Sequence, residues 1–182
     1  MIGLVIGAVV ILYLIFIYNG LVKARQVKEE AWSGIDVQLK RRADLIPNLI
    51  ETVKGYAAHE KGTLEQIVEL RNKAQAVPQG DVAGRAQAEG LLSQALGKIF
   101  ALAEAYPDLK ANQNFSELQQ SLETIEEEIQ MSRRYYNGAA RDLNVKVESF
   151  PSNLIAGPFG FAKAPFFEIT NEADRAVPSV KF

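Results

Sequence analysis

The chain has 182 residues, with 20 Lys+Arg, 22 Asp+Glu, one histidine and no cysteine. This length suits one domain and hardly two. The lack of cysteine excludes disulfide frameworks, thiol chemistry and cysteine-ligated metal centres, and a single histidine cannot supply the paired ligands of most catalytic metal sites. The formal charge of −2 gives no electrostatic drive toward nucleic acid, so we expect no nucleic-acid partner.

Residues 1–18 predict a transmembrane anchor. The segment reads MIGLVIGAVVILYLIFIY, carries no charge, and departs from apolar side chains only at Gly3 and Gly7. As a helix it would be about 27 Å long, close to the thickness of the hydrocarbon core. A cleaved signal peptide is the rival interpretation, but no basic residue precedes the run and Tyr18-Asn19-Gly20 follows it. A buried core helix is disfavoured, because a small domain would have to enclose it on all sides.

The charges beyond the apolar run predict how the anchor is oriented. Lys23, Arg25 and Lys28 all lie on its C-terminal side. By the positive-inside rule, we expect the N-terminus outside the membrane and the rest of the chain in the cytoplasm. We expect the same three side chains to contact anionic lipids. The spacing Gly3-x-x-x-Gly7 would let two anchors approach, which points to a homo-oligomer.

A first helical stripe follows the anchor. Its members step by three and four residues and are Trp32, Ile35, Leu39, Arg42, Ile46, Leu49, Val53 and Tyr56. Arg42 is the only charged member. Pro47 interrupts the stripe, and an interior proline either kinks a helix or ends it. Because Asp44 could cap a new helix, both alternatives stay open.

Three more striped segments predict an antiparallel bundle of long helices. The residues expected to start them are Thr63 with Gln66 after a stop at Gly62, then Asp81, then Asn114 with Glu117. The first two segments of the bundle could instead form one long helix. The last stripe runs from Phe115 to Phe150, and Pro151 ends it.

The expected organisation is therefore all-α, with an anchor over residues 1–18, a helical bundle domain over 19–150 and an irregular tail over 151–182. The tail holds five phenylalanines, namely Phe159, Phe161, Phe166, Phe167 and Phe182. Disordered tails are usually poor in aromatic residues, so we expect part of the tail to pack on the bundle. A docking strip for a partner protein is the alternative.

Catalytic motifs are missing from the sequence. His59-Glu60 has no second histidine four residues on, and there is no phosphate-binding loop and no G-x-S-x-G nucleophile elbow. We therefore expect no catalytic residues, no metal and no cofactor, and the chain is not predicted to be an enzyme.

Polar residues gather on two of the predicted helices. The candidates for a polar network or an interaction site are Arg42, Asp44, Arg133, Arg134, Tyr135, Tyr136, Asn137, Arg141 and Asp142. We favour a network in which arginine pairs with carboxylate over a ligand or partner site. Lys40-Arg41-Arg42 is interpreted as a solvated face paired with nearby carboxylates, with lipid binding as the alternative. Glu126-Glu127-Glu128 is interpreted as solvated surface and not as a divalent-ion site.

Several sequence blocks resemble the LemA family. They are Asn19-Gly20-Leu21-Val22, Ala31-Trp32-Ser33-Gly34-Ile35-Asp36, Asp44-Leu45-Ile46-Pro47-Asn48-Leu49, Arg133-Arg134-Tyr135-Tyr136-Asn137, Arg141-Asp142-Leu143-Asn144, Phe150-Pro151-Ser152-Asn153 and Phe166-Phe167. The resemblance implies a bacterial single-pass membrane protein whose soluble part is a bundle of long helices. It assigns no catalytic residues. One relative contributes to magnetosome membrane formation, which implies membrane organisation and not turnover.

Taken with the residues, the resemblance favours a non-enzymatic adaptor or organiser at the cytoplasmic face of the bacterial membrane. Its partners would be membrane lipids through the anchor, copies of itself, or other membrane proteins. The alternative is an accessory subunit of a membrane protease or transporter that docks through the tail. A hidden enzyme ranks third and would require perturbed ionisable groups in a cleft around Arg42, Arg133, Tyr136 and Asp142.

Overall fold

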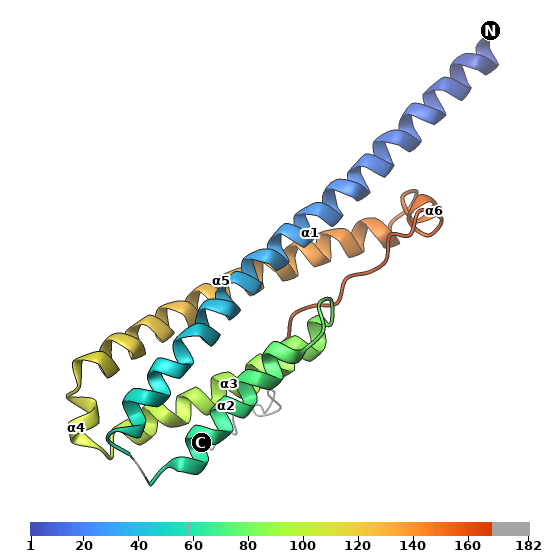
Figure 1. The fold of residues 1–182 in the computed structure, drawn as a ribbon. Coiled ribbons are helices and arrows are strands. Elements are labelled where there is room, and N and C mark those ends of the chain that lie inside the picture. The colour runs from blue at the N-terminus through green and yellow to red at the C-terminus, as the bar shows by residue number, and fades with distance from the viewer. Residues whose placement is uncertain (58, 169–182) are drawn as a thin grey trace, which may run out of the picture. The chain divides into compact units, whose positions relative to one another are not determined.

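The computed structural model describes residues 1–57 and 59–168. These residues form the helices α1 (Ile2–Lys54), α2 (Lys61–Ala76), α3 (Val82–Ala103), α4 (Pro107–Lys110), α5 (Gln113–Glu148) and α6 (Asn153–Ala156), shown in Figure 1. The described residues contain no strand, and the predicted all-α fold is confirmed. Phe182 and the rest of the predicted tail beyond residue 168 lie outside the described residues.

Helix α1 is continuous through Pro47. Proline has no N–H to donate to the carbonyl four residues earlier, which here belongs to Ala43. That carbonyl accepts a hydrogen bond from Arg71 Nε of α2 at 2.7 Å. Of the two alternatives, the one in which Pro47 ends the helix is therefore wrong, and so is a cap at Asp44, whose carboxylate instead accepts from Lys40 at 2.9 Å within the helix. Helices α1 and α2 are also separate and not one long helix.

The described chain divides into two compact units. The first unit comprises residues 1–36 and 130–166, and the second comprises residues 37–57 and 59–129 together with Phe167 and Glu168. Helices α1 and α5 each contribute to both units. The predicted boundaries at residues 18 and 150 concern segments of the chain and stay predictions.

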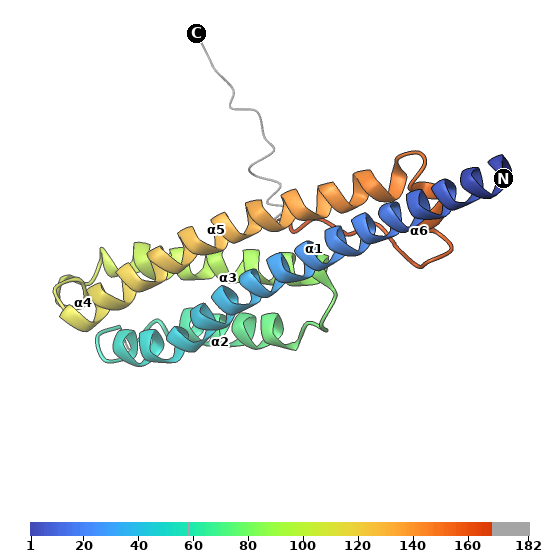
Figure 2. The same cartoon turned by 90° about the horizontal axis from the view of Figure 1, so that it is seen from above.

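The second unit is built from the C-terminal part of α1, helices α2, α3 and α4, and the N-terminal part of α5. Helices α2 and α3 lie side by side and run in opposite directions (Figures 1 and 2). Their connection turns at Gly80, whose φ of 96° is a backbone conformation that glycine adopts without strain. The core contains Ile46, Leu49, Val53, Ile67, Leu92, Ile99 and Phe115. Ile46, Leu49, Val53 and Phe115 belong to the helical stripes that the sequence predicted to be buried.

Helix α3 starts as predicted. Asp81 Oδ1 accepts from the Gly84 N–H at 2.9 Å, which satisfies one of the free donors of the first turn. Helix α2 does not. It begins at Lys61 and contains Gly62 and Thr63, and the preceding Glu60 makes no side-chain cap.

Helix α5 begins at Gln113, and its cap lies two residues earlier than the predicted cap at Asn114. Asn112 Oδ1 accepts from the Phe115 N–H at 2.9 Å, so Asn112 takes the capping position. Both asparagines have the right chemistry for a cap. The side chain of Phe115 itself is fully buried in the core of the second unit.

The first unit packs the early part of α1 against the C-terminal half of α5. The two segments are antiparallel, because Lys146 Nζ donates to the Gly20 carbonyl at 3.1 Å while the rings of Trp32 and Tyr136 meet edge to face at 5.4 Å. A small core of Leu21, Ile155, Ala156 and Phe161 closes the end formed by α6. Helix α5 ends at Glu148, and Phe150, predicted as the last core residue of its stripe, is exposed. Tyr56 in the second unit is likewise exposed, because α1 ends before it.

The anchor segment makes up the first turns of α1. Helix α1 is the one helix in the described residues that is long and apolar enough to cross a membrane, and none of its most apolar window is buried. The first fully buried side chain along α1 is Leu21. The folded part of the first unit thus begins within one helical turn of Tyr18.

Candidate functional site

Arg42 is the centre of a buried cluster of charges in the second unit. Its side chain is 1% exposed. Its Nη2 donates to Glu89 Oε2 at 2.5 Å, and its Nη1 donates to Glu126 Oε2 and to Ser93 Oγ, each at 2.6 Å. On its other side, the Glu89 carboxylate accepts from Arg85 Nε at 2.8 Å. Two positive and two negative charges are therefore matched, and the cluster ties α1, α3 and α5 together.

Sequence reasoning missed Glu89 as the main partner of Arg42. Glu89 is buried on the apolar face of α3, between Ala86 and Leu92, at helical spacing. A charged residue on that face mirrors Arg42 on the stripe of α1, and buried charges are normally paired. This pattern is a signal that could have linked the two residues. Asp44, the partner considered from the sequence, faces Lys40 instead.

The other charged runs are paired as expected for solvated faces. Arg41 Nη1 lies 2.7 Å from Glu128 Oε2, and Lys40 is bonded to Asp44 within α1. Glu126 is the exception among the glutamates of α5, because it joins the Arg42 cluster.

Tyr136 links α5 to the extended segment after α6. Its side chain is buried, its ring packs on Trp32, and its hydroxyl donates to the Pro165 carbonyl at 2.9 Å. Burial raises the pKa of the Tyr136 phenol above its usual value. Asn144, two turns further along α5, both donates to the Ala164 carbonyl (2.9 Å) and accepts from the Ala164 N–H (2.7 Å). Sequence reasoning missed this role of Asn144, because nothing in the spacing indicates that the tail returns along α5.

The remaining candidates on α5 do not form one cluster. Tyr135 and Arg134 are exposed, and Arg133 and Asn137 are half-buried. Arg141 and Asp142 are neighbours with 3.8 Å between Arg141 Nε and Asp142 Oδ1, and both are largely solvated. The structure therefore places Arg42 and Tyr136 in separate polar arrangements in different units.

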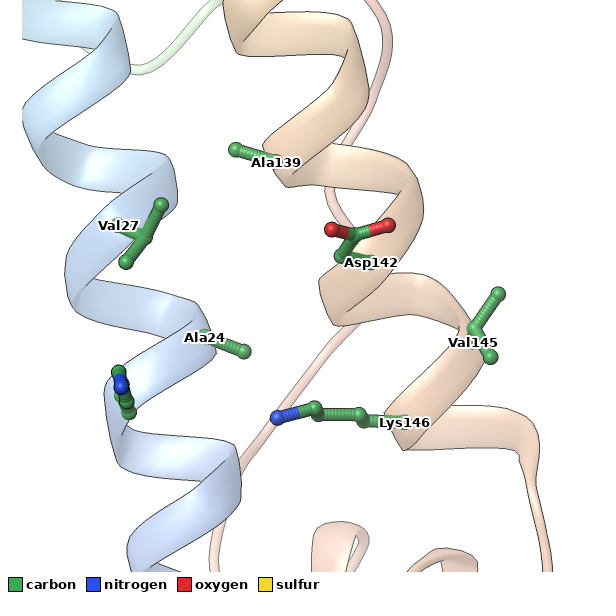
Figure 3. A pocket seen from close by; sticks show the side chains of 7 residues that line it. Ala24, Val27, Ala139, Asp142, Val145 and Lys146 are labelled. Carbon is green, nitrogen blue, oxygen red and sulfur yellow. The ribbon is translucent and has the colours of Figure 1, made fainter.

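A shallow groove of about 400 Å³ lies between α1 and α5 in the first unit (Figure 3). Its lining residues are Lys23, Ala24, Val27, Ala139, Asp142, Val145 and Lys146. Figure 3 shows Ala24 and Ala139 on the facing sides of the two helices and Lys146 reaching from α5 toward α1. The groove thus brings together Lys23, predicted to contact lipid, and Asp142, predicted to belong to a polar network or an interaction site.

The three predicted lipid-contacting residues differ in their surroundings. Lys23 is exposed. The Arg25 guanidinium lies over the Phe161 ring, 4.9 Å from its centroid, in a cation–π arrangement. Lys28 is half-buried and lies 4.0 Å from the Glu29 carboxylate. Lys23 is the side chain best placed to reach a ligand in solvent. Over the described residues, no group of three or more His, Cys, Asp or Glu side chains could hold a metal ion.

Comparison with known proteins places these features in a family. The model of the LemA family matches residues 31–182. The chain is 26% identical to magnetosome proteins MamQ 1 and MamQ 2 of Paramagnetospirillum magneticum, over 83% of this chain and 64% of each relative. It is 25% identical to Protein LemA of Metamycoplasma hominis, over 82% of this chain and 68% of that protein. The chain thus spans less than two thirds of the length of the magnetosome relatives. Since the family model covers most of its length, the chain belongs to the LemA family.

Proposed function

We propose that the chain is a non-enzymatic, membrane-anchored adaptor or organiser at the cytoplasmic face of the bacterial inner membrane. Residues 1–18 would cross the bilayer once, and the two helical units would lie in the cytoplasm. The similarity to relatives that are named magnetosome proteins supports a membrane-associated role.

The continuity of α1 is the observation that carries this proposal. The helix runs without interruption from the exposed apolar segment into the buried positions Leu21 and Ala24. Anchor and first unit therefore share one helix, with no linker between them. A flexible tether would let the folded part move freely, whereas a shared helix holds it at the bilayer surface. Such a fixed position suits a protein that organises what lies at the membrane.

The charges beside the anchor support the proposed orientation. Residues 19–28 contain Lys23, Arg25 and Lys28 and no acidic residue. Basic residues next to a span favour the cytoplasmic side and are attracted to anionic lipids, by about 1 kcal/mol for each. Because Arg25 is stacked on Phe161 and Lys28 is half-buried, we expect Lys23 to contribute most to lipid contact.

Photocrosslinking in native membranes tests the organiser role. A photoreactive residue would replace Tyr135, exposed on α5, or Phe166, exposed in the tail, and captured proteins would be identified by mass spectrometry. The same residue at Leu91, exposed on α3, controls for random collisions. Recovery of mainly the chain itself at Tyr135 supports a self-assembling organiser. Recovery of one other membrane protein at Phe166, and not at Leu91, would contradict it and favour an accessory subunit.

A further inference from the structure

The chain between α5 and the extended segment, residues 149–160, exposes an unusual amount of apolar surface. Beyond residue 18, the three most exposed large apolar side chains in the described residues are Phe150 (79%), Leu154 (65%) and Phe159 (61%). All three belong to this short stretch, which includes α6. We call residues 149–160 the α6 loop. Exposed apolar side chains that gather in one short segment indicate a binding surface, whereas single ones scattered over a protein do not.

The α6 loop lies at the level of the last turns of the anchor segment. The Phe159 ring meets the Tyr18 ring edge to face, with 5.2 Å between the centroids. Leu14, Ile15 and Tyr18 of α1, with Ile155 and Phe159 of the loop, line an apolar hollow of about 310 Å³. Leu14 and Ile15 are part of the apolar run that would lie in hydrocarbon. Side chains that share a hollow with them are therefore at the boundary between hydrocarbon and headgroups.

The packing of the two long helices places the loop at the same depth. Lys146 of α5 bonds to the Gly20 carbonyl of α1, and the two segments are antiparallel. Val147, the next residue of α5, and Ile17 of α1 both pack against the small core of Leu21, Ile155, Ala156 and Phe161. The end of α5, from which the α6 loop continues, therefore lies beside the part of α1 that precedes Gly20. Figures 1 and 2 both show α6 next to this end of α5.

The charges around the α6 loop suit an anionic bilayer surface. Residues 145–163 contain Lys146, Glu148 and Lys163, and Lys163 Nζ is bonded to Glu148 at 2.7 Å. Lys146 adds to the three basic residues of the facing segment 19–28. Glu29 and Glu30 follow that segment and Asp142 lines the groove with Lys146, so basic side chains outnumber acidic ones only slightly. Basic side chains just beyond an apolar surface are typical of elements that lie in the membrane interface.

We propose that the α6 loop is a second membrane-contacting element, which inserts Phe150, Leu154 and Phe159 at the hydrocarbon–headgroup boundary and accepts a lipid acyl chain in the hollow against Leu14 and Ile15. Lipid is the occupant because the hollow is continuous with the lipid-facing surface of the anchor segment. The anchor and the loop together give the first unit two points of attachment, which fix its rotation about the axis of α1. This inference rests on the proposed anchor, and the experiment below separates the two.

Spin labels on single cysteines test the depth of the loop, since the natural chain has no cysteine. The full chain would be reconstituted in vesicles of phosphatidylethanolamine and phosphatidylglycerol with a label at Leu154→Cys. Phe16→Cys, exposed within the apolar run, is the hydrocarbon control, and Tyr135→Cys, exposed on α5, is the water control. Collision rates with oxygen and with a water-soluble nickel chelate then report the depth of each label.

We expect the Leu154 label to collide several-fold more with oxygen, and several-fold less with the nickel chelate, than the Tyr135 label does. A Leu154 label as accessible to nickel as the Tyr135 label, with the Phe16 label in hydrocarbon, would overturn the loop proposal and leave the anchor standing. A Leu154 label shielded from both reagents would also overturn it and point to a second copy as the occupant. A Phe16 label in water would overturn the anchor itself.

Discussion

Replacing Arg42 by methionine is expected to destabilise the second unit strongly. Methionine keeps an unbranched side chain of similar length on the buried stripe but leaves the carboxylates of Glu89 and Glu126 without their shared partner. Removing one partner of a buried ion pair costs about 3–5 kcal/mol. We expect a loss near the lower end of this range for two reasons. The Glu89 carboxylate keeps its ion pair with Arg85 Nε at 2.8 Å, and the Glu126 side chain is 35% exposed, so water can hydrate it.

Thermal unfolding of the full chain in lipid nanodiscs, followed by circular dichroism, measures this effect. For a unit of this size, about 3 kcal/mol lowers the midpoint by roughly 10–20 °C. Arg41→Met is the matched control, because Arg41 is adjacent and pairs with Glu128 at a largely solvated position. An exposed pair is worth less than about 1 kcal/mol. The double variant Arg42→Met/Glu89→Met should lose less stability than the two single variants lose when their losses are added. Equal midpoints for Arg41→Met and Arg42→Met would refute the assigned role of the cluster.

Four further predictions concern single residues. Tyr136→Phe removes the hydrogen bond to Pro165, so hydrogen exchange of residues 161–166 should speed up, whereas exposed Tyr135→Phe should leave it unchanged. Burial raises the pKa of the Tyr136 phenol, so the folded state holds the phenol proton more tightly than the unfolded state does. The stability that this difference contributes is complete below the usual tyrosine pKa of about 10 and is lost as the pH rises through the raised pKa of the folded state. Measuring the free energy of unfolding against pH checks this prediction. Asp81→Ala removes the cap of α3 and should lower the free energy of unfolding, measured with a denaturant, by about 1 kcal/mol. Gly80→Ala, at a φ of 96°, should cost about 1 kcal/mol or more in the same assay.

The helices could be predicted from the sequence because their apolar faces repeat at helical spacing. The stripe of α1 is buried from Ile35 to Val53, and α5 buries its stripe from Phe115 to Leu143. Helix ends were predicted less well, since several residues near each end have the chemistry of a cap. Asp81 was identified correctly, whereas Asn112 takes the place predicted for Asn114. Only the packing of the whole unit decides between such neighbours.

Contacts between distant parts of the chain account for what the sequence left open. Pro47 is tolerated in α1 because Arg71, on another helix, satisfies the carbonyl that proline leaves free. Asn144 of α5 forms two hydrogen bonds with the backbone of Ala164, where the tail passes along the helix. The sequence around either residue contains no pattern that would predict this pairing. Glu89 differs, because its place on the apolar face of α3 was visible in the sequence.

Cysteine-accessibility mapping tests the central claim that residues 1–18 cross the membrane once and leave both units in the cytoplasm. Single cysteines at Ile2, at Tyr135 of the first unit and at Val68 of the second would be exposed to a membrane-impermeant maleimide, in intact spheroplasts and after lysis. The account predicts that Ile2→Cys is labelled in intact spheroplasts, and that Tyr135→Cys and Val68→Cys are labelled only after lysis. Labelling of either of the last two in intact spheroplasts, at the rate seen for Ile2→Cys, would contradict it.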